Sequence, residues 1–153
     1  EAKCVIRIFQ ARIKNVRYIN MQVNDSFSYE SPTLKWLEFR PNDDFELQSE
    51  QKEVNMKLKF DVRIHEDKNL PEASVDLTCE LGGKESAYPY YLRITETSRF
   101  RWVEDMDKGK VKQLLELNAP ALLLSFLRPM VLQITVASHF TACQIPFVDF
   151  TKR

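Results

Sequence analysis

An apolar segment near the C-terminus, residues 119–137, constrains the fold more than any other feature of the sequence. It reads APALLLSFLRPMVLQITVA, and as a helix it would present apolar side chains on nearly all sides. A helix of that kind is stable in water only when other structure covers it all round. The cover can come from a membrane, from the rest of the same domain, or from another protein chain.

A membrane is the cover that fits this segment least. A span needs about 20 predominantly apolar residues, whereas Arg128 lies in the middle of this segment and Ser125 and Gln133 are also polar. We therefore expect no direct membrane insertion. Pro129 lacks the N–H of a normal helical hydrogen bond, so the helix should be kinked there.

A second copy of the chain is the cover that we favour. One sheet can cover only one flank of the helix, and the other flank would then pack in a homo-oligomer, a dimer or a tetramer. Each large apolar side chain buried contributes about 1.5–3 kcal/mol, so a handful offsets an association cost of about 4–15 kcal/mol. Burial inside a single domain is the alternative. The residues expected at the interface between copies are Leu123, Phe126, Leu127, Met130, Val131 and Ile134.

Alternation of apolar and polar residues predicts strands before the helix. The clearest one covers residues 52–66, and residues 73–81 and 87–103 repeat the pattern. Residues 5–23 also alternate, with a slip of phase that predicts a bulge or bend. Such alternation is typical of an antiparallel sheet with one covered face. The sequence therefore predicts an α+β fold, in one domain over residues 1–153.

Residues 24–50 lose this periodicity and contain Pro32 and Pro41, which predicts a long connection. A long loop that carries many large apolar side chains must lie on other structure or bind something. The large apolar residues of this connection are Leu34, Trp36, Leu37, Phe39 and Phe45.

The last third of the sequence changes to a helical period. Residues 107–117 predict a short helix. Asn118 is expected to cap a second helix, in which Pro120 occupies the first turn, where its missing N–H costs little. An extended tail should follow from Phe140 to Phe150.

Composition excludes several classes of function. Lys plus Arg and Asp plus Glu number 22 each, so the basic surplus of a strong nucleic-acid binder is missing. Arg99 and Arg101 alternate with aromatic residues, as on a nucleic-acid-binding strand, but an ordinary strand with charges outside explains them better.

Three widely spaced cysteines form no CxxC pair, and their odd number favours a reducing compartment. No signal peptide is recognisable, because charges interrupt the N-terminal apolar residues.

Catalytic and metal-binding patterns are not expected either. His139 and Cys143 are four residues apart, but two ligands do not make a zinc site. The acidic pairs at residues 43–44 and 104–105 are typical of solvated loops, and no nucleophile or phosphate-binding motif occurs. We therefore expect no enzymatic activity, no metal and no cofactor.

The C-terminal sequence resembles the SecB family of protein-export chaperones. From residue 122 to residue 150 it aligns without gaps with the long helix of that family and the stretch that follows. Arg128 matches the helix arginine, Phe140 the aromatic residue that closes the helix region, and Val148 with Phe150 the terminal V-x-F pattern.

Two earlier features extend the resemblance over about residues 9–150. Cys79 and Glu80, ahead of two glycines, resemble the C-E pair of the family, and Trp36 resembles the tryptophan of its crossover loop. The resemblance implies a four-stranded antiparallel sheet with a long helix on one side. It also implies a dimer of dimers in the cytoplasm that binds unfolded polypeptide clients in apolar grooves and delivers them to the SecA motor.

On this resemblance, Leu34, Trp36, Leu37, Phe39 and Phe45 would line the client-binding groove, and Glu80 would be a residue that docks SecA. The chain is neutral, whereas family members are usually acidic, so a SecB-like chaperone dedicated to one partner, such as an antitoxin, is an alternative. A scaffolding subunit and a small-molecule carrier are further alternatives, which a folded partner or a bound native ligand would reveal.

Overall fold

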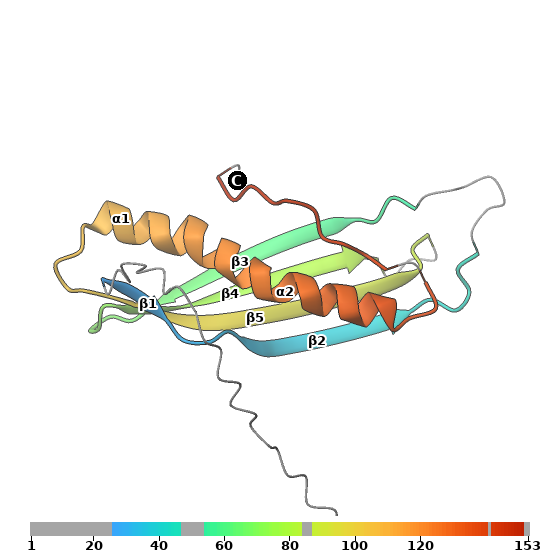
Figure 1. The fold of residues 1–153 in the computed structure, drawn as a ribbon, viewed down its shortest axis with the longest axis horizontal. Coiled ribbons are helices and arrows are strands. Elements are labelled where there is room, and N and C mark those ends of the chain that lie inside the picture. Colours follow the sequence, from blue (N-terminus) through green and yellow to red (C-terminus); the bar gives the residue numbers. More distant parts are fainter. Residues whose placement is uncertain (1–25, 47–53, 84–86, 141, 152–153) are drawn as a thin grey trace, which may run out of the picture.

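The computed structural model describes residues 26–46, 54–83, 87–140 and 142–151. It consists of one antiparallel sheet and one long helical run that lies across it (Figure 1). The strands are β1 (Phe27–Tyr29), β2 (Thr33–Pro41), β3 (Leu58–Glu66), β4 (Glu72–Gly82) and β5 (Tyr90–Trp102). The helical elements are α1 (Lys108–Gln113), the π-helical stretch η1 (Leu114–Asn118) and α2 (Ala119–Val136). The predicted α+β class with an antiparallel sheet and a C-terminal helix is thereby confirmed.

Within the described residues the sheet has five strands rather than the four expected. Their order is β1–β5–β4–β3, and β2 also pairs with β5. β4 occupies one side of β5, so β1 and β2 lie end to end along its other side, β1 beside Phe100–Trp102 and β2 beside Tyr90–Thr97. The fifth strand arises because one edge strand is broken in two. Pro32 lies in the break, where its missing N–H removes a possible ladder hydrogen bond.

The prediction of a long connection over residues 24–50 was wrong, since β1 and β2 both lie within that range. The alternation rule missed β2 because it requires a strict period of two, and β2 contains a bulge between Leu34 and Trp36. The predicted strands over residues 52–66, 73–81 and 87–103 correspond to β3, β4 and β5. The strand predicted over residues 5–23 lies outside the described residues.

The helical elements form one continuous run rather than two capped helices. Asp107 caps its start, with the side chain accepting a hydrogen bond from the backbone N–H of Lys110. Asn118 has helical backbone angles and makes no capping hydrogen bond, so its predicted role was wrong. Pro120 clashes with a normal helical carbonyl four residues before it, and η1 lies at this point, with the N–H of Ala119 bonded to the carbonyl of Leu114. α2 continues through Pro129, and the kink there stays a prediction.

The hydrophobic core lies between the sheet and the helical run. Alternate residues of β4 and β5 point towards α2, which contacts both strands. The helix is buried against them through Leu123, Leu127 and Val131. The other core residues on the two strands include Val75, Leu77, Cys79, Leu81, Leu92, Ile94 and Phe100.

Gly82 closes the end of β4 and could not carry a side chain. Its φ is +75°, and an added Cβ would lie 2.0 Å from the backbone oxygen of Tyr90. Its N–H donates to the carbonyl of Lys57 at 2.7 Å, which joins the approach to β3 to the end of β4. The glycine is therefore required by geometry at this corner of the sheet.

Candidate functional site

Half of the large exposed apolar side chains among the described residues lie on two surfaces. One is the helix-side surface of β2, with Leu34 and Leu37. The other is the flank of α2 that faces away from the sheet, with Phe126, Leu132 and Val136. Exposed apolar patches on a soluble domain indicate binding surfaces when they are grouped rather than scattered.

The bulge in β2 divides the predicted groove residues between the two faces of the sheet. Leu37 pairs with Ile94 and Leu34 with Glu96, so both leucines point to the helix side. Trp36 pairs with Thr95 instead and lies on the opposite, open face. The five predicted residues therefore do not form one groove, because one extra residue in a strand reverses the direction of the side chains that follow it.

Phe39 and Phe45 belong to a chain of aromatic contacts at one end of the sheet. The ring of Phe39 lies 5.6 Å from that of Tyr90, and Phe140 lies 6.3 Å from Tyr90 and 6.0 Å from Phe45. Offset and edge-to-face contacts of this kind are stabilising. Phe39 and Phe45 thus fasten the end of β2 and the following connection to the segment after α2, while Leu34 and Leu37 remain open.

The six residues predicted at an interface between copies lie on different flanks of α2. Leu123, Leu127 and Val131 are 0% exposed within the single chain, so they have no surface left for a second copy. Met130 and Ile134 are half-buried against the core. Of the six, only Phe126 is exposed, at 41%. An interface through the helix must therefore use its outer flank.

The segment after α2 lies extended against the helix and β3 (Figure 1). Ile145 and Phe150 are buried, and the ring of Phe150 lies 6.3 Å from that of Phe60. Arg128 fixes the segment by donating from Nη2 to the carbonyl of Pro146 at 2.7 Å. The pair forms part of a hollow of about 540 Å³ whose lining is Arg128, Pro129, Leu132, Gln144, Ile145, Pro146 and Phe147.

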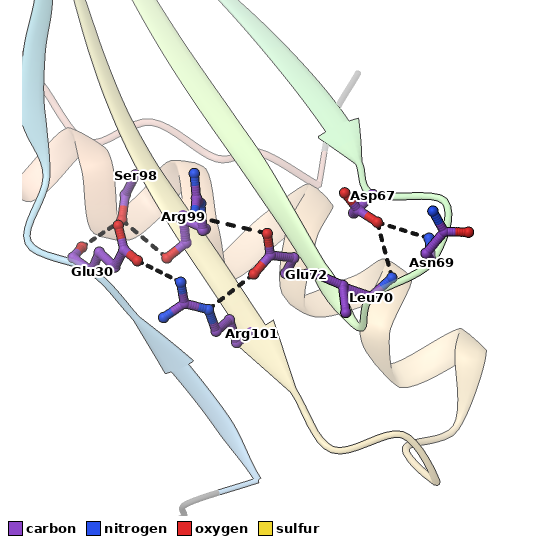
Figure 2. A network of polar contacts seen from close by, with 8 residues as sticks. All are labelled: Glu30, Asp67, Asn69, Leu70, Glu72, Ser98, Arg99 and Arg101. Carbon is purple, nitrogen blue, oxygen red and sulfur yellow. Dashed lines mark hydrogen bonds and ion pairs between the residues drawn. The ribbon is translucent and has the colours of Figure 1, made fainter.

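Ion pairs cover the open face of the sheet. Figure 2 shows one cluster, in which Arg101 donates to Glu30 at 2.7 Å and to Glu72 at 3.0 Å. In the same cluster the hydroxyl of Ser98 donates to the carbonyl of Glu30 at 2.5 Å, which holds the chain at the break between β1 and β2. Glu80, the expected SecA-docking residue, lies on this face with a carboxylate oxygen 3.5 Å from Nε of Arg93.

Several buried groups have shifted pKa values, among them Glu96, Asp76 and Cys79. Burial raises the pKa of Glu96, a carboxyl on the helix side that has one oxygen without a hydrogen-bond partner among the described residues. Burial acts to raise the pKa of Asp76 too, but hydrogen bonds from Lys35 and Thr97 outweigh it and hold that pKa below its usual range. Burial raises the pKa of the Cys79 thiol to about 12, which makes it unreactive.

The residues considered above as metal ligands or catalytic acids form no cluster among the described residues. Within the part of the chain that the structure describes, no three His, Cys, Asp or Glu side chains are grouped as metal ligands would be. The acidic pairs at residues 43–44 and 104–105 are exposed. His139 lies against Phe140, with ring centroids 3.9 Å apart, rather than forming a site with Cys143.

The helical run from residue 108 to residue 136 is long and apolar enough to cross a membrane by length and composition alone. Its apolar inner flank is already used, because it packs on β4 and β5. Within the single chain, 39% of its most apolar stretch of 18 residues is buried.

Several residues that build these surfaces gave no recognisable signal in the sequence. Tyr90 joins the aromatic chain, Glu96 is a buried carboxyl in an ordinary alternating strand, and Lys35 is the bulged residue of β2. Only the extra residue at Lys35 could have been suspected, had residues 33–41 been read as a strand with a break in its alternation.

The family model described as preprotein translocase subunit SecB matches residues 13–152, nearly the whole chain. The chain belongs to the SecB family. Among solved structures, this SecB-family fold is similar to the Mycobacterium tuberculosis SecB-like chaperone Rv1957 in complex with a ChAD peptide from the Rv1956 HigA1 antitoxin. The match has a TM-score of 0.66 and 12% identity, and covers 82% of this chain and 92% of the other.

A protein of unknown function from Streptococcus agalactiae is a more distant match, with a TM-score of 0.37, 13% identity, and coverage of 79% of this chain and 97% of that one. A comparison with curated proteins gives no match.

Proposed function

We propose that this SecB-family protein is a non-catalytic chaperone that binds non-native polypeptides along β2, on the helix side of the sheet. The observation that carries the proposal is an edge strand with exposed leucines beside it. Leu34 and Leu37 are 46% and 43% exposed, and β2 pairs only with β5 among the described strands.

An unfolded client offers what such an edge can bind. Its free backbone N–H and C=O groups can add a strand to an open sheet edge, and its apolar side chains can cover the exposed leucines. Backbone pairing does not depend on sequence, so the site should accept many clients. The SecB family of the chain supports this proposal, as does its likeness to a SecB-like chaperone whose structure contains a peptide.

The same proposal includes a homo-oligomer through the outer flank of α2. Phe126, Leu132 and Val136 lie on that flank, and a second copy would remove them from water. The interface predicted from the sequence is thereby moved from the inner flank to the outer one. Of the six residues predicted from the sequence, only Phe126 belongs fully to the proposed outer interface, and Met130 and Ile134 would lie at the margin of that interface.

Suppression of client aggregation tests the proposal. A chemically unfolded client is diluted into buffer without nucleotide, and light scattering is followed with increasing amounts of the protein. We expect near-stoichiometric suppression. The double variant Leu34→Ser and Leu37→Ser should weaken it several-fold, because two exposed apolar contacts are lost. Leu70→Ser is the matched control, since Leu70 is 57% exposed on the distant turn before β4.

The controls distinguish loss of the client-binding surface from loss of folding. Circular dichroism should be the same for the wild type and both variants, because all three leucines are exposed. If the wild type leaves scattering unchanged, the chaperone proposal is wrong. If Leu70→Ser loses as much aggregation suppression as the double variant does, clients do not bind along β2.

A chaperone dedicated to one partner is the second candidate. The likeness to a SecB-like chaperone solved with an antitoxin peptide favours it. Such a protein would bind one folding partner tightly and suppress aggregation of that partner only. A panel of unrelated clients distinguishes the two candidates.

Delivery of clients to SecA in the cytoplasm is a finer part of the proposal. Glu80 is paired with Arg93 rather than free, so docking through it would require this pair to open. Binding of purified SecA to the wild type and to Glu80→Gln tests the step. If SecA binds both proteins equally, or binds neither, Glu80 is not a SecA-docking residue.

A further inference from the structure

The bulge in β2 places two neighbouring side chains on the open face of the sheet. Leu34 pairs with Glu96 and Trp36 with Thr95, which leaves Lys35 as the extra residue. The ammonium of Lys35 reaches Asp76 of β4 on that face, with Nζ 2.6 Å from Oδ2. Trp36 beside it is 56% exposed, an unusual position for a tryptophan on a face otherwise covered by ion pairs.

These two residues form one wall of a shallow cup of about 400 Å³. Its floor is polar and closed, because the hydroxyls of Thr78 and Thr95 lie 2.9 Å apart in a hydrogen bond. The complete lining is Lys35, Trp36, Arg63, Asp76, Thr78, Arg93 and Thr95. The cup therefore combines an aromatic wall, a hydrogen-bonded floor and charged sides.

The charges of the lining are unequal. Three cations face one carboxylate, that of Asp76, which leaves a formal excess of two positive charges. Lys35 and Thr97 hold Asp76 ionised, so Lys35 is already used inside the cup. Arg63 and Arg93 supply the excess.

Each of the two arginines has one carboxylate partner. Nε of Arg63 donates to Asp61 at 3.0 Å. The side chains of Arg63 and Asp61 are 65% and 50% exposed, and exposed pairs of this kind contribute little. Arg93 approaches Glu80 at 3.5 Å, and its buried Nε makes no hydrogen bond within the described residues. Arg101, at the other end of the same face, contrasts with them, because it is held by two carboxylates (Figure 2).

We propose that this cup is a docking site for an acidic segment of a partner protein. A carboxylate of the partner binds between Arg63 and Arg93, whose planar guanidinium groups suit bidentate pairing. An apolar side chain next to that carboxylate packs on the exposed ring of Trp36. The occupant is therefore a short peptide in which acidic and apolar residues are neighbours.

A nucleic acid fits the same face less well. The neighbouring hollow shares Arg63 and Arg93 but adds Asp61 and Glu80 to its lining. A phosphate backbone carries closely spaced charges and would lie over these carboxylates once it left the cup. A single carboxylate of a peptide can contact Arg63 and Arg93 without approaching Asp61 or Glu80.

The cup and the proposed client surface are on opposite faces of the sheet. Leu34 and Leu37 point to the helix side, and Trp36 points away from it. A partner in the cup would leave the client surface free, so both can be occupied together. The inference is independent of the chaperone proposal.

Fluorescence of Trp36 tests the inference directly. The chain has two tryptophans, so Trp102→Phe leaves Trp36 as the only reporter. The probes are short synthetic peptides that alternate Leu with Glu, Gln or Lys, together with single-stranded oligothymidylate. We expect the Glu peptide to bind most tightly and to change the emission of Trp36. Its binding should weaken at about 1 M salt, where charges are screened beyond about 3 Å.

Arginine variants locate the site. Arg63→Gln and Arg93→Gln should each weaken the Glu peptide about two- to fivefold, the range for partly exposed ion pairs. Arg101→Gln is the matched control on the same face and should bind as the wild type does. Arg63 is the decisive position if Arg93→Gln disturbs the fold, because its side chain is 65% exposed.

The inference fails on any of three results. Equal affinity for the Glu and Gln peptides would show that charge is not recognised. Tighter binding of the Lys peptide or of oligothymidylate would show a different partner class. Wild-type affinity in Arg63→Gln, or an equal loss in Arg101→Gln, would place the peptide outside the cup.

Discussion

The two flanks of α2 carry the same kinds of side chain in opposite environments. Leu127 is 0% exposed on the inner flank, and Leu132 is 39% exposed on the outer one, although they are one residue type on one helix. The difference arises from the sheet, which covers only the inner flank. Apolar sequence therefore identifies the helix as a buried element, while only the fold decides which side is left for a partner.

The largest effect should come from the inner flank. Leu127→Ala should lower the free energy of unfolding by about 2–5 kcal/mol, because it leaves a cavity under the helix. Leu132→Ala should lower it by less than about 1 kcal/mol when the oligomer is dissociated, since an exposed side chain contributes little. Urea unfolding of both variants measures the difference. Equal losses would mean that the two flanks do not differ as described.

Assembly into an oligomer should depend on the outer flank of α2, whereas stability depends on the inner one. Phe126→Asp places a charge on the outer flank and should reduce the mass of the native particle in sedimentation without unfolding it. Leu127→Asp places a charge in the core and should unfold the chain rather than dissociate a folded oligomer. Gln133→Asp, at an exposed polar position, is the control. An unchanged particle in Phe126→Asp would exclude the outer flank as the interface.

Glu96 is a charged residue in the inner layer, and it lies in register between Leu77 and Leu34. Burial raises its pKa in the folded state above the ordinary value of 4.5, so the folded chain binds more protons above that pH. Stability is therefore lost as pH rises from 4.5 through the raised pKa.

Glu96→Gln should remove this loss. We expect the variant to be more stable near neutral pH, because the amide carries no charge that burial would penalise. The gain should vanish below pH 4.5, where both chains are neutral at this position. Thermal unfolding across this pH range measures it. A gain that is independent of pH would show that charge burial is not the cause.

The smallest effect is expected on the open face of the sheet. Arg101→Gln removes two ion pairs, with Glu30 and Glu72, but all three side chains contact solvent. Its urea midpoint should stay close to that of the wild type at high salt, because water and ions screen exposed pairs. A large shift at high salt would show that the open face supports the fold as the helix side does.

The sequence predicted the elements whose pattern is regular. Alternation over residues 58–66 and 72–82 reflects one covered face of the sheet, and the apolar run over residues 119–136 reflects the core helix. β2 was missed because its bulge and prolines break the period, so a strand was taken for a connection. Asn118 was taken for a cap because its residue type is permissive, while Pro120 was accommodated by η1 instead.

The candidate site was predicted only in part, again because the bulge in β2 breaks the alternation of its side chains. Leu34 and Leu37 were predicted to line a binding groove, and both are exposed on β2, which pairs only with β5 among the described strands. Trp36 was assigned to the same groove because its direction depends on the bulge at Lys35, which composition does not reveal. Likewise, the inner and outer residues of α2 could not be separated without the sheet that covers one of them.

Hydrogen exchange with a bound unfolded client measures the central claim most directly. If clients add to the open edge of the sheet, the backbone amides of β2, residues 33–41, should exchange more slowly in the complex than in the free protein. The amides of the turn that contains Leu70 should not change. Formation of a client complex with unaltered exchange throughout β2 would contradict the claim.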